Sequence, residues 1–374
     1  MNKKQLLLLL GLGVVLAAVA VIVSRKQSAA YQPAARSGAK LLGEFDLNAV
    51  AALHLRHGSN SLTLAQKGDV WVVQERGDYP ADFNLISDLL RQFWNLKIAR
   101  SVAAGPSRLP ALGLDRSNPS ATLLEMKDAR GQLLRSVLLG AGSANEGRRG
   151  TAGRYVMVGS DPQTVCLVAD DLSSVTPTPE RWLSKDFFKI EKLKSVAVVT
   201  PVATNNWKFT RDTESADWKL ADATPAETLD AGKVSGLSNL LSSPSFNDVS
   251  PVPTALEQPV VATLETFDGF TYTVKVAAPA EDDCRLQLAV SAQFATARPP
   301  GKDEKPEDKD RLDKEFKANR QKLEQKLKTE QSYAKWTYIV AKWTVDQLLK
   351  VRHEFCAEKP VASPPPAVPV PDGK

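Results

Sequence analysis

The same order of predicted segments occurs twice along this chain of 374 residues. Each copy begins with three short segments of alternating apolar residues, a pattern typical of an antiparallel β-meander. These segments are residues 48–56, 61–64 and 69–74 in the first copy and 194–200, 206–210 and 217–220 in the second. Trp71 and Trp218 hold the same place in the third segment. The repetition predicts two α+β modules in tandem.

A helix is predicted directly after each tryptophan segment. Apolar residues recur with helical spacing at 84–96 and again at 230–241. Asp82 and Asp230 lie at the start of these stretches and are suitable N-cap residues. Each module is therefore expected to pack one helix against its strands.

Further pairs of segments extend the correspondence between the copies. A hairpin at 120–139 is matched with one at 261–276. The segments 154–158 and 164–172 are matched with 336–340 and 345–349. The last pair is more widely separated than the others, which indicates an insertion in the second copy at about 298–335.

The insertion at 298–335 is rich in charged residues with helical spacing. Acidic residues precede basic residues by four positions, as in Glu307 with Arg311 and Glu324 with Lys328, and this orientation stabilises a helix. A thin apolar stripe is formed by Leu312, Phe316, Leu323 and Leu327. The pattern predicts either a solvated protruding helix or a coiled-coil-like arm for a partner.

An uninterrupted apolar run at residues 5–23 is long enough to cross a bilayer as a helix. Its flanking residues are basic: Lys3, Lys4, Arg25 and Lys26. We expect an uncleaved transmembrane anchor, and the alternative is a cleaved secretory signal, because small residues follow at 28–30. The expected location is the inner (cytoplasmic) membrane, crossed once, with the soluble body in the periplasm, since long soluble domains translocate largely regardless of flanking charge.

The net charge of +5 at pH 7 does not indicate a nucleic-acid partner. Basic residues beside the apolar run and in the insertion account for the surplus, so the remaining chain is close to neutral. A nucleic-acid-binding surface requires a concentrated positive patch. Neither a nucleic-acid partner nor a small-molecule ligand is predicted.

The predicted domain organisation follows from these features, and the predicted fold class is α+β. The chain is divided into an anchor at 1–26, a linker at 27–41, a first module at 42–189, a second module at 190–359 with the helical insertion, and a disordered proline-rich tail at 360–374. Each module is expected to hold antiparallel strands and one packing helix.

The sequence predicts no catalytic, cofactor-binding or metal-binding site. The glycine-containing stretch 140–145 lacks the third glycine and the following helix of a dinucleotide-binding loop, and with 146–153 it is interpreted as a long hairpin loop. His54 and His57 lie three positions apart on a predicted strand, so they point to opposite faces and cannot share a metal. We therefore expect a protein that is not an enzyme and has no cofactor.

Cysteine and tryptophan residues are interpreted mainly as core residues. The three cysteines are widely spaced, and Cys166 lies in an apolar stretch; a disulfide between two of them is the alternative. Trp71, Trp218, Trp336 and Trp343 occupy strand-like positions where their rings are expected to pack. A sugar-stacking platform is the alternative use of these rings.

Several short motifs occur in a fixed order in the first module. They are Trp71, Tyr-Pro-Ala-Asp at 79–82, Leu-Gly-Leu-Asp at 112–115, Asn-Pro at 118–119, Leu-Gly at 139–140, Tyr-Val at 155–156 and Trp-Leu-Ser-Lys-Asp at 182–186. With the anchor, they make the chain resemble the bacterial family called domain of unknown function 4340, over about residues 42–188 and more loosely in the second copy. The resemblance implies no catalytic residues, and it implies a periplasmic protein that accompanies ABC-type export or gliding-motility transporters.

Two functions are compatible with these features. The leading hypothesis is a non-enzymatic, membrane-anchored envelope protein that acts as an auxiliary or scaffold subunit of an ABC-type export or gliding-like transporter, with transporter subunits as partners. The alternative is an envelope glycan-binding protein or hydrolase with a site between the two copies, which requires clustered exposed aromatic and carboxylate side chains.

Overall fold

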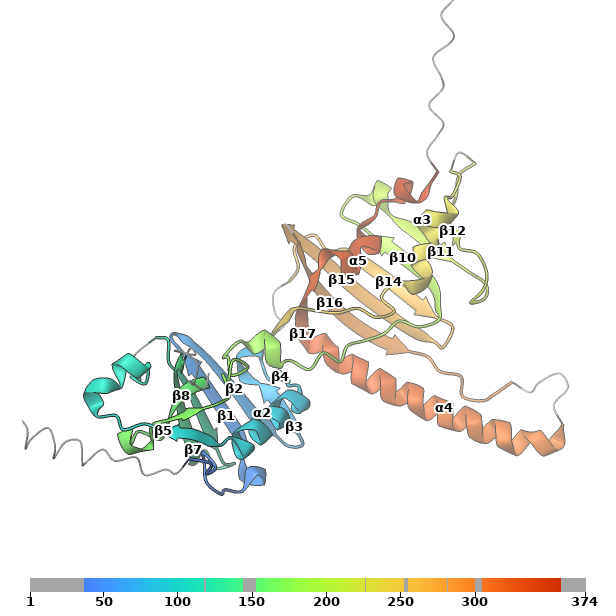
Figure 1. Ribbon diagram of the computed structural model, residues 1–374. Helices are drawn as coiled ribbons and strands as arrows, with labels where there is room; N and C mark the ends of the chain where they lie inside the picture. Colours follow the sequence, from blue (N-terminus) through green and yellow to red (C-terminus); the bar gives the residue numbers. More distant parts are fainter. Residues whose placement is uncertain are drawn as a thin grey trace, which may run out of the picture. The chain divides into compact units, whose positions relative to one another are not determined.

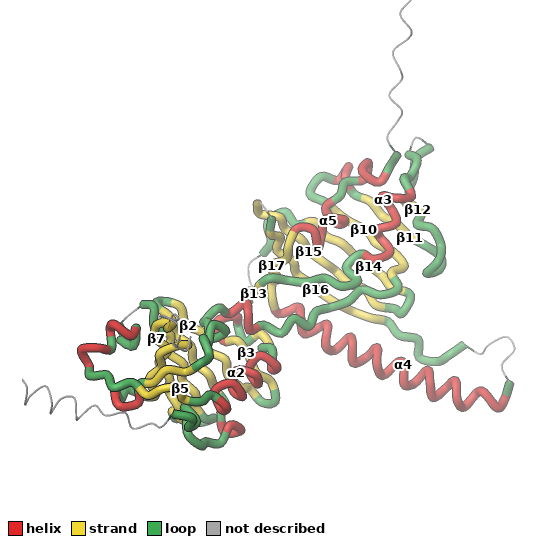
Figure 2. Tube along the Cα trace, in the orientation of Figure 1, coloured by secondary structure: helices red, strands yellow, loops and turns green. Residues whose placement is uncertain are grey.

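The computed structural model describes residues 37–117, 119–143, 153–225, 227–251, 255–280, 282–299 and 305–357. The chain divides into two compact units, Met1–Ser184 and Lys185–Lys374. Each is a mixed α+β unit with one antiparallel sheet and few helices (Figure 1, Figure 2). The apolar run at 5–23 and the proline-rich tail at 360–374 lie outside the described residues. Within the described ranges, no helix has the length and apolar character needed to cross a membrane.

The described residues of the first unit form a nine-stranded sheet in the order β4-β3-β2-β1-β6-β7-β8-β9-β5. Its strands are β1 (Ala52–His57), β2 (Asn60–Lys67), β3 (Val70–Val73), β4 (Tyr79–Pro80), β5 (Ile98–Ser101), β6 (Thr122–Lys127), β7 (Leu133–Ser143), β8 (Gly153–Val158) and β9 (Cys166–Val168). Short 3-10 helices connect them: η1 (Leu47–Ala49), η2 (Gln74–Arg76), η3 (Pro106–Arg108), η4 (Pro110–Leu112), η5 (Pro162–Thr164) and η6 (Pro179–Trp182).

The predicted helix of the first unit is confirmed as α2 (Phe83–Asn95). Asp82 is its N-cap, and the Asp82 carboxylate accepts hydrogen bonds from the backbone N–H groups of Asn84 and Leu85. Its buried residues are Ile86, Leu89 and Phe93, which have helical spacing. The apolar spacing and the cap are both local signals, which is why they identify this helix from sequence.

We expect Asp82→Ala to destabilise the first unit by about 1 kcal/mol, because the first turn of α2 loses its acceptor. Asp82→Asn retains an oxygen acceptor and is expected to preserve the unit. Hydrogen–deuterium exchange of peptides from α2 measures the change without interference from the second unit. Equal loss of protection in both variants would contradict a capping role.

In the part of the second unit that the structure describes, eight strands form a sheet in the order β12-β11-β10-β14-β15-β16-β17-β13. The strands are β10 (Leu193–Val199), β11 (Trp207–Thr210), β12 (Lys219–Leu220), β13 (Asp248–Pro251), β14 (Val260–Thr266), β15 (Phe270–Ala280), β16 (Asp283–Ala292) and β17 (Trp336–Ala341). The helical segments are α3 (Ala231–Ser235), α4 (Pro306–Ser332), α5 (Lys342–Leu349), η7 (Ala203–Asn205), η8 (Gly236–Asn239), η9 (Tyr333–Lys335) and η10 (Arg352–Phe355).

Both sheets have the same strand order once β4 is set aside. In each sheet a three-stranded meander is followed by a helical segment, and the strand after that segment pairs at the far edge of the sheet. The register also agrees, since Leu55 lies opposite Leu124 in the first sheet and Val196 lies opposite Leu264 in the second. All four side chains are buried.

The match of 154–158 with 336–340 is wrong. By position in the sheet, β8 corresponds to β16, and β9 corresponds to β17. Strand β16 was not predicted, although its residues alternate between buried and exposed as expected for a strand. The insertion therefore lies between β16 and β17, and α4 occupies most of it.

Two other helical segments differ from the prediction. The helix predicted at 230–241 is short, because α3 ends at Ser235 and a 3-10 helix continues to Asn239. Gly232 and Gly236 lower the helix propensity of this stretch. The segment 345–349, matched with a strand-like stretch of the first copy, belongs to helix α5, whose buried residues Val345 and Leu348 have helical spacing.

Candidate functional site

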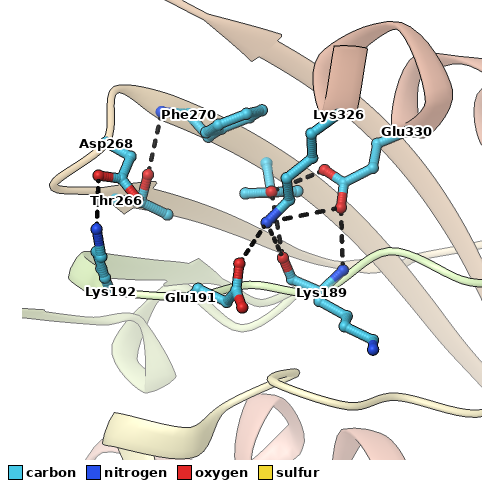
Figure 3. A network of polar contacts seen from close by, with 9 residues as sticks. Lys189, Glu191, Lys192, Thr266, Asp268, Phe270, Lys326 and Glu330 are labelled. Carbon is cyan, nitrogen blue, oxygen red and sulfur yellow. Dashed lines mark hydrogen bonds and ion pairs between the residues drawn. The ribbon is translucent and has the colours of Figure 1, made fainter. Parts of the chain in front are cut away.

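The C-terminal end of α4 is attached to the second sheet by a polar network in which Glu330 and Tyr272 are buried (Figure 3). The Glu330 carboxylate accepts hydrogen bonds from the Lys189 backbone N–H at 3.0 Å and from the Tyr272 hydroxyl at 2.8 Å. Lys326, one turn earlier, donates to the Lys189 carbonyl oxygen at 2.9 Å and pairs with Glu191 at 3.0 Å. The segment before β10, strand β15 and helix α4 are thus joined by five residues.

The network contains a buried carboxyl group, since Glu330 is only 4% exposed, and glutamate is seldom buried without a partner. Burial raises the pKa of Glu330, and the hydrogen bonds from Lys189 and Tyr272 oppose this effect. Burial and the neighbouring Glu330 raise the pKa of Tyr272 as well. The tyrosine therefore remains a hydrogen-bond donor to the carboxyl, which suits attachment of the helix.

This network was not predicted, although the sequence of α4 contains a signal for it. Phe316, Leu323 and Glu330 are spaced by seven residues, so they lie along one side of α4. Glu330 thus continues the side of the helix that carries the apolar stripe. A charged residue at such a position indicates a specific buried partner.

The remainder of α4 is held more loosely. Arg298 pairs with Asp313 at 3.1 Å, and Arg320 donates to the Ala295 carbonyl oxygen at 3.4 Å. These contacts lie on the same side as the apolar stripe, whose residues are half-buried. On the opposite side, Lys314, Lys317 and Lys328 are exposed.

The ion pairs that Arg311 and Glu324 make within α4 differ from those that the i,i+4 spacing predicts for them. Arg311 pairs with Asp308 at 3.1 Å and Glu315 at 2.9 Å, and Glu324 pairs with Arg320 at 2.8 Å. Several partners are available at three or four positions along a charged helix, so spacing alone does not select one.

The short motifs of the first unit contact one another through their backbones. The Asp82 N–H donates to the Trp182 carbonyl oxygen at 2.8 Å, and the Ser184 N–H donates to the Pro80 carbonyl oxygen at 2.9 Å. Ala81 and Leu183 form a β-bridge. The motifs at 79–82 and 182–186 therefore join the start of α2 to the last residues of the unit.

A second motif contact depends on glycine. A Cβ on Gly140 would lie 2.3 Å from the Leu112 carbonyl oxygen, and a Cβ on Gly113 would lie 2.7 Å from the Ala141 backbone nitrogen. Gly113 also has a φ of +66°, in the left-handed region. The motifs at 112–115 and 139–140 are thus explained by close packing.

A family model described as Domain of unknown function (DUF4340) matches residues 71–259. The chain belongs to this family. The match begins in β3 at Trp71 and reaches beyond the first unit to the residue before β14. No curated protein and no solved structure matches the chain significantly.

In this DUF4340 protein the histidines of β1 lie apart. His54 Nδ1 is 3.7 Å from the Glu125 carboxylate, and His57 Nδ1 is 3.0 Å from the Thr122 hydroxyl. Their positions along the strand place them on opposite faces of the sheet. Among the residues that the structure describes, no group of His, Cys, Asp or Glu is arranged to hold a metal.

The glycine-containing stretch 140–145 falls partly in a strand of the DUF4340 protein. β7 continues through Gly140 and Gly142 to Ser143, and residues 144–152, which include most of the predicted loop, lie outside the described residues.

The tryptophans of the DUF4340 protein are placed as predicted with one exception. Trp71, Trp218 and Trp336 are buried, and the prediction for these rings is confirmed. The prediction for Trp343 is wrong, because this residue lies in α5 and is 67% exposed. Cys166 is buried as predicted, and all three cysteines are free thiols.

Proposed function

We propose that this DUF4340 protein is a non-enzymatic, membrane-anchored envelope protein that acts as an auxiliary or scaffold subunit of an ABC-type export or gliding-like transporter. In this proposal the apolar run at 5–23 spans the inner membrane, and both units lie in the periplasm. Family membership and the apolar run support the location. The shared strand order supports an origin of the two units by tandem repetition.

The observation that carries the proposal is the way in which α4 is attached. Its C-terminal end is anchored by buried Glu330, and the helix runs for 27 residues, far longer than α2 or α5. In Figure 1 the rest of the helix extends beyond the strands of its own unit. A long helix with an exposed basic side, fixed at one end, is suited to contact another protein.

The glycan-binding alternative receives less support from the side chains. Trp71, Trp218 and Trp336 are buried, so these rings are not available to stack on a sugar. Trp343 is the exposed ring among the four tryptophans named as candidates.

The test is recovery of transporter subunits after brief crosslinking in cells, followed by capture of the tagged full-length protein in mild detergent and mass spectrometry. We expect permease and ATPase subunits to be enriched over an anchor-only control. Reversing three charges on α4, by Lys314→Glu, Lys317→Glu and Lys328→Glu, is expected to lower this recovery by at least about fivefold, or about 1 kcal/mol. The reason is that charges at an interface determine how fast the partners associate and how they align.

The matched control reverses three exposed lysines on the sheet of the same unit, by Lys194→Glu, Lys208→Glu and Lys275→Glu. It changes the net charge equally and is expected to leave recovery unchanged. Equal losses in both triple variants would refute α4 as the contact surface. Recovery of the wild-type protein without any transporter subunit would refute the proposed role itself.

A further inference from the structure

A hollow of about 440 Å³ lies on the first unit beside the turn between β1 and β2. Its volume is within the usual range of ligand pockets. Gly58 in this turn has a φ of +58°, and a Cβ there would lie 3.4 Å from the Pro119 carbonyl oxygen. The β1–β2 turn and the segment containing Pro119 are therefore in close contact, and they form part of the hollow's wall.

The floor of the hollow is apolar and is built by strand register. Arg56 on β1 lies opposite Leu123 on β6, and Leu123 lies opposite Leu138 on β7, so the three side chains share one face of the sheet. Leu123 and Leu138 are 6% and 1% exposed and belong to a cluster of buried residues with Leu114. The floor is thus fixed by the sheet and does not depend on a loop.

The rim of the hollow is positively charged. Arg56 and Arg116 both line it and are both exposed. The Arg56 guanidinium makes no hydrogen bond or ion pair with any described residue, and the Arg116 guanidinium makes one long hydrogen bond, 3.4 Å to the Gly159 carbonyl oxygen. Two guanidinium groups are thus available beside an apolar floor.

Carboxylates do not neutralise this rim. The described residues that line the hollow include no acidic side chain. Asp115 accepts a hydrogen bond from the Ser117 N–H at 3.0 Å, and Glu125, two positions from Leu123 on β6, pairs with Lys127 at 3.1 Å. The fork-shaped donors of arginine match carboxylate and phosphate oxygens.

We propose that the hollow binds a small amphipathic anion, with a carboxylate or phosphate between Arg56 and Arg116 and a short apolar portion against Leu123 and Leu138. At roughly 30 Å³ for each water-sized group, 440 Å³ accommodates about 15 such groups. A fatty acid and an alkyl phosphate share this chemistry. The site goes beyond the proposed scaffold function and does not require it.

The second sheet has different side chains at the corresponding positions. By strand order and register, the positions of Arg56, Leu123 and Leu138 correspond to Ala197, Thr263 and Thr273. The three corresponding positions of the second sheet therefore carry neither a charged residue nor a leucine. Alanine at the position of Arg56 is compatible with this type of sheet.

The experiment measures binding by isothermal titration calorimetry, with the full-length protein in phosphatidylcholine nanodiscs and with empty nanodiscs subtracted. The probes are octyl phosphate, octanoate, inorganic phosphate and octyl glucoside. We expect octyl phosphate or octanoate to bind at least tenfold more tightly than inorganic phosphate and octyl glucoside. Tighter binding of octanoate assigns a carboxylate to the site, and tighter binding of octyl phosphate assigns a phosphate.

The double variant Arg56→Ala with Arg116→Ala is expected to bind the preferred probe at least tenfold more weakly. The control, Arg91→Ala with Arg130→Ala, removes two exposed arginines of the same unit that do not line the hollow, and it is expected to bind as the wild type does. Unchanged binding by the first variant would overturn the proposal. So would binding of inorganic phosphate or octyl glucoside as tight as that of the preferred probe, or no heat above that of empty nanodiscs.

Discussion

Replacing Glu330 by alanine is expected to lower the free energy of unfolding of the second unit by about 3 kcal/mol, because the change breaks a buried polar network. The Lys189 N–H and the Tyr272 hydroxyl both lose their acceptor, and Lys326 loses a nearby carboxylate, 4.0 Å away. Urea unfolding followed by pulsed hydrogen exchange measures the second unit separately. Alanine at the exposed Lys328, two residues earlier in α4, is the control and is expected to have little effect.

Glutamine at position 330 separates hydrogen bonding from charge. Its side-chain oxygen can accept from the Lys189 N–H and the Tyr272 hydroxyl, so Glu330→Gln is expected to retain most of the stability lost in Glu330→Ala. If both variants lost the same stability at neutral pH, the ion pair with Lys326 and not the hydrogen bonding would be the main contribution of Glu330.

The stability difference between Glu330→Gln and the wild type is expected to depend on pH. Since burial raises the pKa of Glu330 in the folded protein, the protonated carboxyl is favoured by folding. The resulting stabilisation is present below the unfolded pKa of about 4.3 and is lost as pH rises through the folded value. The glutamine variant should therefore gain stability relative to the wild type across this window. A difference that did not change with pH would show that Glu330 has the same pKa in both states.

Alanine at Gly153 is expected to destabilise the first unit by about 3 kcal/mol, at the upper end for an overpacked site. A Cβ there would lie 1.9 Å from the Val168 carbonyl oxygen, and the next residue, Arg154, pairs with Val168 across β8 and β9. Because the obstacle is backbone, the two strands must separate to admit the methyl group. Loss of hydrogen-exchange protection in β8, β9 and β5 is the expected result.

Gly142 provides a matched control for Gly153. It lies in β7, which pairs with β8 on the side away from β9. A Cβ on Gly142 would come no closer than 4.0 Å to its nearest neighbour, the Gly153 carbonyl oxygen. Gly142→Ala should therefore fold like the wild type. Comparable destabilisation by both substitutions would mean that chain flexibility, and not the close approach of β8 to β9, requires glycine here.

Local signals were sufficient for part of the fold. The start and the buried side of α2 follow from Asp82 and from the spacing of Leu89 and Phe93, all within one short segment. The same reasoning located Asp230 as a cap, and the structure shows that its carboxylate accepts from the backbone N–H groups of Gly232 and Lys233. The length of that second helix was not predicted, because two glycines compete with the apolar pattern.

Features that depend on pairing between distant segments could not be predicted from the sequence. The hollow depends on the register that places Arg56, Leu123 and Leu138 in one row across three strands, and this register is set by pairings between distant segments. The wrong match of β8 with β17 has the same cause, because short strands of similar composition can be exchanged unless the sheet order is known. Trp343 was misplaced because a large aromatic residue is typical of a strand and also occurs on exposed helices.

The edge strands β5 and β13 have a consequence for the order in which the chain can fold during synthesis. Each pairs with a strand that is made much later, β9 for β5 and β17 for β13. In the second unit the whole of α4 must be synthesised before β17, so the β13–β17 pair has a longer intervening segment than the β5–β9 pair. Pairings of high sequence separation form slowly, and the second sheet is therefore the last part of the protein to close.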